Sequence, residues 1–593
     1  MHVRQVPAKN GRINVAIVQS YWQDGHSKTR TVKGFGYLDE LDRIHGDGLG
    51  YVKSECDKMN AQAAKANASQ DIIIYPLEKI DKRVTSVKNI GCAVPLFHYN
   101  SLGIEKVLRN KTRNSKIAFD INAVCRLLAI DRIISPGSKL SAWQEREGYF
   151  FKSNFTDDDL YRALSIIASA KSSVIRAMNS NIQAAYGREL SNVFYDVTNY
   201  HFEIDEEDDF RKRGICKKKS GKPIVAMGLV QDARGIPYTY RLFEGNTLDC
   251  QTLIPAMAEV KEELGLQRIV VVADRGINSS DNIAAMVATS NGFIFSQSIR
   301  HTKSTAELRA WALSEAGYKN SLDKDGNVTF MIKSRQDVKT ITVEGELNPK
   351  TGRPKKKKVE IDTKSVAFWS AKYAYRDKTS REKTLAKSRE LVKNPGAYNR
   401  ATSYGAAKYV KNIAFDRDTG EIIEEAGKKA VIDEELIAIE EACDGYYCII
   451  TSETAMADSD IVDTYRELWR IEESFKVIKS CLDGRPVYVR TEDHIEAHFL
   501  ICYIALVIMR LIQYTTGFAY SAETIIKELK KMDGVHLQDN WWRFSYRSDI
   551  TEVLTGSVGI DLTRKNMRLE EIKGILTKVN GKQHLRYVKH STL

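Results

Sequence analysis

Two adjacent acids, Glu472 and Glu473, lie in the amphipathic stretch YRELWRIEESFKVIKS at residues 465–480. At about 100° per residue, one α-helix over this stretch places four apolar residues in a core-facing stripe about 80° wide: Leu468, Ile471, Phe475 and Ile478. Glu472 lies at the margin of that stripe, where a carboxylate is costly unless a partner pairs with it. Glu473 lies about 100° further round the helix and is expected to point toward water. The spacing favours Glu472 for chemistry, with a salt bridge to a neighbouring lysine as the structural alternative.

Two more acids lie on predicted strands. Asp196 is in the middle of the alternating pattern NVFYDVTNYHFE, on the face of Phe194 and Thr198. Asp274 follows the apolar run IVVVA, which is typical of a strand covered on both faces. Open α/β sheets place ligands at the carboxyl ends of such strands, although an acid there can also cap the next helix. Together with Glu472, the two aspartates form a predicted catalytic triad.

Three converging carboxylates repel one another and raise one another's pKa. Hard divalent cations relieve this repulsion, and Mg²⁺ prefers carboxylate oxygens, water and substrate phosphate. A pair of such ions clamps the attacking and leaving oxygens of an in-line phosphoryl transfer, so that no nucleophilic side chain is required. The triad therefore predicts metal-dependent chemistry on phosphodiesters.

The composition agrees with a nucleic-acid partner. The 593 residues carry a formal net charge of +12, with basic clusters at 211–213, 217–219 and 355–358. Each cluster alone is explained equally well as a solvated loop, but together they favour nucleic acid. Nine cysteines without a CxxC pair suit reduced thiols in the cytoplasm. The longest apolar run, 499–509, is too short to cross a bilayer and the N-terminus lacks a secretory signal, so no membrane is expected.

The elements around the acids predict a mixed α/β protein. Antiparallel strands followed by strand, helix and strand form the centre, and a β-hairpin is expected over 13–38. We divide the chain into six segments: 1–70 (β-hairpin and helix, candidate DNA-binding region), 71–190 (helical, candidate for binding DNA ends), 191–300 (first part of the α/β core), 301–455 (largely β insertion), 456–515 (core completed by the Glu472 helix) and 516–593 (helical).

In this order the motifs resemble those of the DDE transposases of bacterial insertion sequences. More closely, the chain is similar to the branch whose RNase H-like core carries a β-rich insertion before the glutamate. That branch has the signature Tyr, two residues, Arg, three residues, Glu, six residues, Lys, and Tyr465, Glu472 and Lys479 match it. Leu468 stands at the arginine position, which is a departure from the pattern. The segments DVT at 196–198 and ADRG at 273–276 resemble those that carry the family's two aspartates.

The resemblance implies a DNA transposase. Asp196, Asp274 and Glu472 would be the catalytic residues and the ligands of two Mg²⁺ ions, for which Mn²⁺ can substitute. Water would hydrolyse one strand at the element end, and the freed 3′-hydroxyl would attack the second strand or the target. The partners implied are double-stranded DNA, both element ends and target, and a second copy of the chain in a homodimeric synaptic complex.

Four further residues are candidates for DNA binding. The resemblance implies that Tyr465 and Lys479 contact phosphates near the scissile bond. Arg275, beside Asp274, is a candidate for the same role, and Arg470 is a candidate to replace the missing arginine of the signature, although it points elsewhere on the helix.

Three alternatives stay open. A nuclease on the same core would cut DNA without strand transfer, and a decayed element would encode a DNA-binding protein without catalysis. A zinc enzyme could use His494 and His498, which are spaced i, i+4. The zinc-protease pattern needs a glutamate directly after the first histidine, whereas Glu496 comes two residues after it. The zinc alternative is therefore disfavoured.

Overall fold

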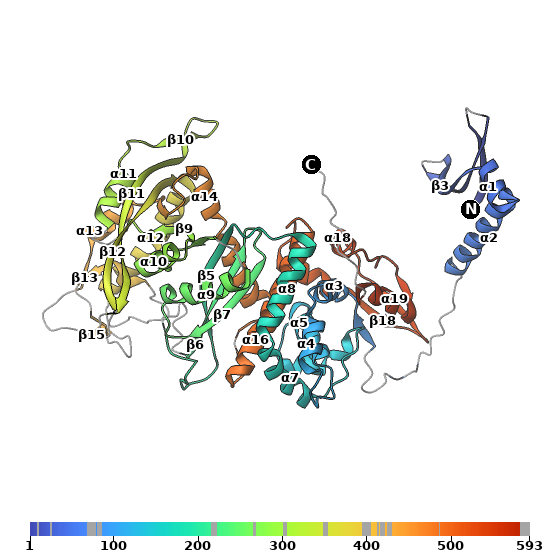
Figure 1. The fold of residues 1–593 in the computed structure, drawn as a ribbon, viewed down its shortest axis with the longest axis horizontal. Helices are drawn as coiled ribbons and strands as arrows, with labels where there is room; N and C mark the ends of the chain where they lie inside the picture. The colour runs from blue at the N-terminus through green and yellow to red at the C-terminus, as the bar shows by residue number, and fades with distance from the viewer. Residues whose placement is uncertain are drawn as a thin grey trace. The chain divides into compact units, whose positions relative to one another are not determined.

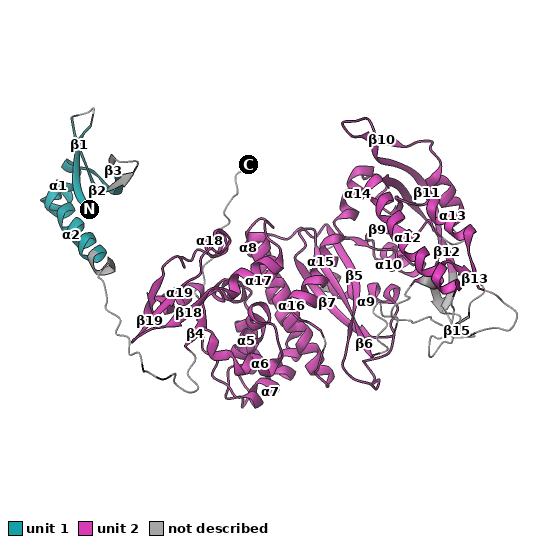
Figure 2. Ribbon diagram, turned by 180° about the vertical axis from the view of Figure 1, so that it is seen from behind, with its two compact units in different colours: residues 1–82 teal, residues 83–593 magenta. Residues whose placement is uncertain are grey.

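The computed structural model describes residues 1–580 except 9–10, 24–25, 68–76, 78, 80–85, 215–221, 265–267, 301–304, 348–353, 394–404, 412–413, 416–421, 424–429 and 486. The chain forms two compact units, residues 1–82 and 83–593, which are coloured separately in Figure 2. The basic cluster at 217–219 lies outside the described residues.

The first unit is a three-stranded antiparallel sheet followed by two helices: β1 (His2–Pro7), β2 (Ile13–Gln23), β3 (His26–Tyr37), α1 (Leu38–His45) and α2 (Gly48–Asn67). Strands β2 and β3 form the hairpin predicted over 13–38, paired from Asn14 with Tyr37 to Gln23 with His26. A small core of Val15, Ile17, Leu41, Val52 and Cys56 joins the sheet to the helices.

The centre of the second unit is a mixed sheet built from five strands and two helices: β5 (Asn192–His201), β6 (Ile224–Asp232), β7 (Pro237–Glu244), α9 (Asp249–Leu264), β8 (Val270–Ala273), α10 (Ser280–Ala288) and β9 (Gly292–Gln297). The order is β7-β6-β5-β8-β9, with β5 to β7 antiparallel and β8 and β9 parallel to β5. This topology confirms the RNase H-like core that the resemblance predicted.

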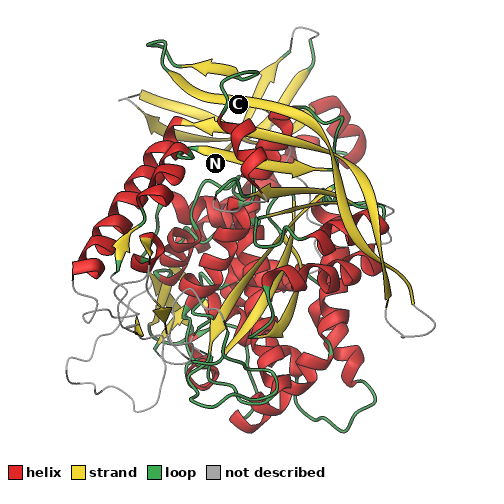
Figure 3. Cartoon of the chain, turned by 90° about the vertical axis from the view of Figure 1, so that its left-hand side faces the viewer, coloured by secondary structure: helices red, strands yellow, loops and turns green. Residues whose placement is uncertain are grey.

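The insertion extends this sheet. Its elements are α11 (Ala306–Leu313), β10 (Lys319–Leu322), β11 (Val328–Leu347), β12 (Pro354–Ser370), α12 (Ala371–Lys393), β13 (Val410–Lys411), β14 (Ala414–Phe415), β15 (Ile422–Ile423), β16 (Val431–Ile432), α13 (Glu434–Ala442) and β17 (Tyr446–Thr451). Strand β17 pairs with β9, and the order continues β17-β12-β11-β10. Figure 3 shows the long β11–β12 hairpin. The insertion is largely β, as expected, and the long helix α12 packs against this hairpin.

The stretch 465–480 is not one helix. Helix α14 (Asp458–Arg466) ends before α15 (Trp469–Lys476) begins, and α15 continues into a π-helical turn, η5 (Val477–Cys481). The long helix α16 (Glu492–Thr515) follows. Although α16 is long and apolar enough to cross a membrane by length and composition, 94% of its apolar window is buried within the protein. It is a core helix, as its apolar run predicted.

The alternation of side chains along β5 and β8 divides the central core into two layers. Val193, Tyr195, Val271 and Ala273 pack on the side of α9 and α10. Phe194, Val270 and Val272 pack on the side of α15 and α16. The sheet is therefore covered on both faces, and the even-numbered residues of both strands face α15 and α16.

A helical region packs around α16: α3 (Ala93–Ser101), α4 (Ile104–Thr112), α5 (Ile121–Ile134), α6 (Lys139–Gln144), α7 (Asp157–Ser169) and α8 (Lys171–Tyr186). Figure 1 shows α16 between the sheet and these helices. The periodicity over 70–190 thus predicted helices correctly.

The C-terminal part contains helices α17 (Ala522–Lys530), α18 (Asp549–Ser557) and α19 (Leu569–Asn580) and three strands: β18 (Asp533–His536), β19 (Trp541–Phe544) and β20 (Asn566–Arg568). The C-terminal region is mainly helical, as expected, but its three short strands were not predicted. The strands form a sheet with β4 (Val87–Asn89), in the order β20-β19-β18-β4. Strands of three or four residues are too short to show alternation, and β4 is more than 400 residues away in the chain.

Candidate active site

Strand pairing brings Asp196 and Asp274 to neighbouring positions. The last pair between the parallel strands β5 and β8 joins Tyr195 to Ala273. Asp196 and Asp274 come directly after this pair in the chain, so their backbone positions lie side by side at this edge of the sheet. Asp196 is half-buried and Asp274 is exposed.

Both aspartates belong to the face that α15 covers. Phe194 and Val272 lie two residues before them and pack in the same core cluster as Phe475 of α15. Because strand side chains alternate, the two carboxylates are directed to this face rather than toward α9 and α10. The backbone N–H of Val197 donates to Asp196 Oδ1 over 2.8 Å.

Tyr465, at the end of α14, holds Asp274. Its hydroxyl donates a hydrogen bond to Asp274 Oδ1 over 3.1 Å. Burial of the phenol, together with the charge of Asp274, raises the pKa of Tyr465. The hydroxyl therefore stays protonated near neutral pH and keeps donating to the carboxylate.

Lys479 lies over the same face, reaching it from the turn η5. Its Nζ donates to Thr198 Oγ1, and Thr198 follows Asp196 by two residues on the same side of β5. The ammonium also lies 5.2 Å from the centroid of the Tyr200 ring. A positive charge is thus positioned two residues along the strand from Asp196.

Glu472 is exposed on α15, above this face of the sheet. The four stripe residues of the helix prediction are buried, as expected: Leu468, Ile471, Phe475 and Ile478. Among the described residues, no three histidine, cysteine, aspartate or glutamate side chains lie together closely enough to hold a metal ion. Strand pairing thus brings the backbones of Asp196 and Asp274 together, and the three candidate acids do not form a metal-binding group in this structure.

The expectation that Glu473 points to water is wrong. Its Oε2 accepts a hydrogen bond of 3.1 Å from Arg510 Nη1, and only 2% of Arg510 is exposed. Burial lowers the pKa of this arginine, and the Glu473 carboxylate opposes that shift. The prediction considered only the residues of one helix. In the structure, α16 brings Arg510 to the side of α15 that was expected to face solvent.

A pocket of about 230 Å³ opens beside Asp274. Its lining includes the candidate Arg275, which is exposed, and residues that the sequence interpretation did not single out: Ser296, Ser298, Arg300, Tyr446 and Tyr447. Two sequence signals could have identified these pocket residues. One is the segment DGYYCIITSE, which contains the two tyrosines, and the other is the polar end of the strand pattern GFIFSQSI.

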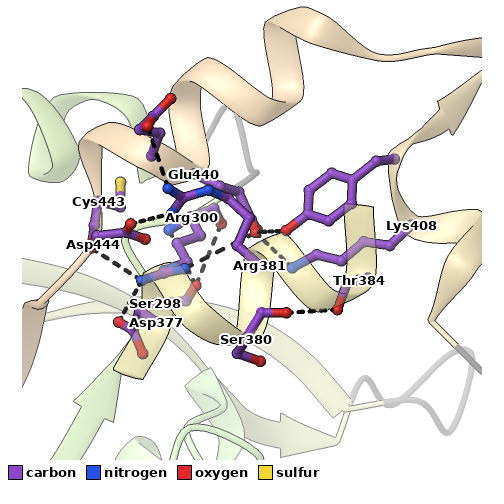
Figure 4. A network of polar contacts seen from close by, with 12 residues as sticks. Ser298, Arg300, Asp377, Ser380, Arg381, Thr384, Lys408, Glu440, Cys443 and Asp444 are labelled. Atoms are coloured by element: carbon purple, nitrogen blue, oxygen red, sulfur yellow. Dashed lines mark hydrogen bonds and ion pairs between the residues drawn. The ribbon is translucent and has the colours of Figure 1, made fainter. Parts of the chain in front are cut away.

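Ion pairs from the insertion hold one wall of this pocket (Figure 4). Arg300 Nη2 donates to Asp377 Oδ2 of α12 over 2.9 Å and to the carbonyl of Cys443 over 3.0 Å. Arg381, also on α12, pairs with Asp444. Because Tyr447 donates to the same Asp377 over 3.2 Å, α12 and the start of β17 are joined where the pocket begins.

Arg470 lies apart from the two aspartates. It pairs with Glu467 and donates to the carbonyl of Arg234 over 3.4 Å, in the turn between β6 and β7. This turn lies near the start of β5, because Val193 pairs with Asp232. The side chain therefore reaches toward the opposite end of β5 from Thr198 and Lys479.

The histidines of the zinc alternative do not form a ligand pair. His498 Nδ1 lies 3.1 Å from Lys139 Nζ, and His498 Nε2 lies 3.2 Å from the carbonyl oxygen of Gly484. Both ring nitrogens of His498 are thus engaged, which leaves no free lone pair for a metal.

Comparisons with known families agree with this geometry. The family model of the transposase DDE domain matches residues 196–508, starting at the first candidate aspartate and spanning more than half of the chain. The model of the IS1634 family transposase N-terminal domain matches residues 3–70, within the first unit. No curated protein matches the chain. The chain belongs to the DDE transposases of insertion sequences.

Proposed function

We propose that this transposase cleaves one DNA strand at each end of its element and joins the freed 3′-hydroxyl to target DNA. The observation that carries the proposal is the pair Asp196 and Asp274, which follow the last pair of β5 and β8 and face α15. Two neighbouring carboxylates supply the oxygen donors that Mg²⁺ or Mn²⁺ prefers. Two bound ions would activate water and neutralise the charge that develops on the phosphate.

Glu472 is the third proposed ligand. Its exposed side chain on α15 can change rotamer at little cost, because no buried packing holds it. Helix α15 is also short and bounded by a break on one side and a π-helical turn on the other. Such turns occur frequently at functional sites. We propose that α15 brings Glu472 to the two aspartates when DNA and metal are present.

The surrounding side chains position the reactants. Tyr465 orients the Asp274 carboxylate through its hydrogen bond, and is a positioning residue. Lys479 is placed to pair with a phosphate near the scissile bond, and Arg275 is exposed beside Asp274 for the same role. Arg470 is the least suited of the four DNA-binding candidates, because Glu467 already neutralises it.

The remaining assignments concern partners and place of action. We propose that residues 1–70 and the helices within 71–190 bind the element ends, and that 191–300 and 456–515 form the catalytic core, interrupted by 301–455. Two element ends must be held together for joining, which supports a homodimer in the synaptic complex. The protein would act in the cytoplasm on double-stranded DNA.

An assay with labelled duplexes of the element ends and a target plasmid tests the proposal. We expect a nicked strand and then a joined product, both dependent on Mg²⁺ or Mn²⁺. Nicking without any joined product would support a nuclease instead. Binding without nicking in either metal would support a catalytically inactive DNA-binding protein.

A further inference from the structure

A second pocket, of about 320 Å³, lies between the start of α6 and the loop that leads into α16. The charged residues and histidines of its lining, as far as the structure describes them, are two arginines, one lysine, two histidines and one exposed acid: Arg132, Arg490, Lys139, His494, His498 and Asp483. The pocket is therefore positively charged, and none of these residues belongs to the proposed catalytic site.

Lys139 is the central cation of this pocket. Only 9% of it is exposed, and its Nζ lies 3.1 Å from His498 Nδ1. Since the carbonyl of Gly484 can only accept, His498 carries its proton on Nε2 and offers the lone pair of Nδ1 to the ammonium. Burial, followed by the charge of Arg132, lowers the pKa of Lys139 to about 7. A neutral imidazole satisfies one N–H of the ammonium but does not neutralise its charge.

Arg132 is a second buried cation beside it. The residue is 6% exposed, and its Nη1 donates to the carbonyl oxygens of Leu482 over 3.4 Å and Asp483 over 3.1 Å. These partners are backbone dipoles rather than carboxylates. Two neighbouring buried cations whose hydrogen-bond partners here are neutral groups cost free energy. An anion in the pocket would offset that cost.

The opposite side of α16 shows the usual arrangement. There Lys171 pairs with Glu496 over 3.0 Å, and the pocket beside them is also lined by Glu492 and Asp493. The acids of the first turn of α16 thus line that pocket and not the one around Lys139. Among the described residues, Lys171 on that side forms an ion pair with a carboxylate, whereas Lys139 on this side does not.

We propose that the pocket around Lys139 binds a phosphate group. A bridge between Phe202 and Val487 joins the loop of the pocket to the end of β5, six residues beyond Asp196. At about 3.3 Å per residue, this separation is roughly 20 Å. A duplex that follows β5 would therefore present a backbone phosphate to the pocket on the order of six base pairs from the scissile bond. That the bound phosphate belongs to DNA rests on the function proposed above, whereas the binding of a free phosphate ion does not.

Thermal unfolding of the full chain in chloride and in sodium phosphate at equal ionic strength tests the pocket. The wild type should gain roughly 2–5 °C in phosphate. Lys139→Met should lose that gain, and Lys171→Met should keep it. Arg490→Gln, at an exposed residue of the rim, should reduce it without risk to the fold. If Lys139 served only to donate to His498, Lys139→Met would lower the melting temperature and the phosphate response would survive in Arg490→Gln, which would overturn the proposal.

Binding of the end duplex separates the two sources of phosphate. If the pocket takes a DNA phosphate, Arg490→Gln and Lys139→Met should each weaken binding roughly tenfold and lower the salt slope by about one. If the variants lose the gain in melting temperature in phosphate but bind the duplex as the wild type does, the ligand is a free phosphate. If neither changes, the pocket is not a phosphate site. Asp196→Asn should leave both readouts intact, so failure of the catalytic proposal is distinguishable from failure of this one.

Discussion

The two aspartates and the glutamate of the proposed triad are held in different ways. Asp196 and Asp274 follow directly from a parallel strand pair, whose backbone hydrogen bonds place them side by side without any ligand. Glu472 stands on a short helix between two irregular turns and is exposed to solvent. This difference supports the proposal that the sheet provides a preformed part of the site and that DNA and metal bring Glu472 to it.

The largest effect on strand cleavage is expected from substituting the two aspartates. Asp196→Asn and Asp274→Asn should each reduce strand cleavage by roughly a thousandfold, because each removes a charged oxygen ligand worth several kcal/mol in the transition state. The end duplex should still bind, since both residues lie in a site that contributes little to the extended interface. Cleavage and gel-shift assays measure the two effects. Retained cleavage in either variant would refute the assignment of both aspartates as catalytic residues.

Replacing Glu472 should have a smaller effect on cleavage. Glu472→Gln should slow cleavage by roughly a hundredfold and leave the thermal stability unchanged, because the side chain is exposed. The matched control is Asp463→Asn on α14, an acid whose side chain is 70% exposed and which pairs only locally with Arg466. Equal rates for the two variants would exclude Glu472 from the chemistry and leave a two-carboxylate site.

The hydroxyl of Tyr465 joins α14, the helix before α15, to Asp274. Tyr465→Phe should lower the cleavage rate by roughly tenfold at limiting Mg²⁺, with a smaller loss when the metal saturates, since an unoriented carboxylate binds the ion less well. A purely structural role would instead lower the melting temperature and leave the metal dependence unchanged. A Mg²⁺ titration of the initial rate distinguishes the two roles.

The smallest effect on catalysis is expected at Glu473, although it adjoins Glu472. Glu473→Gln should keep the cleavage rate but destabilise the protein by about 1–3 kcal/mol, because Arg510 remains buried beside a neutral amide. Thermal unfolding together with the cleavage rate at low temperature measures this difference. A loss of activity equal to that of Glu472→Gln would show that the two adjacent acids are not separated in function.

Much of the site could be predicted from local patterns. An acid directly after a buried strand, and an acid within an alternating strand, placed Asp274 and Asp196 on one sheet. The four apolar residues of the Glu472 stretch are buried as their spacing predicted. The RNase H-like order of the central strands was implied by the resemblance. The observed order β7-β6-β5-β8-β9 confirms it.

Contacts between distant segments could not be read in this way. The sequence by itself determined which residues are buried, where charge accumulates and which acids follow strands, because these depend on periods of two or 3.6 residues. Only the tertiary structure decided that Arg510 meets Glu473, that Tyr465 holds Asp274, and that β4 joins a C-terminal sheet. Such pairings depend on which helix or strand packs beside another, and a local pattern carries no information about that neighbour.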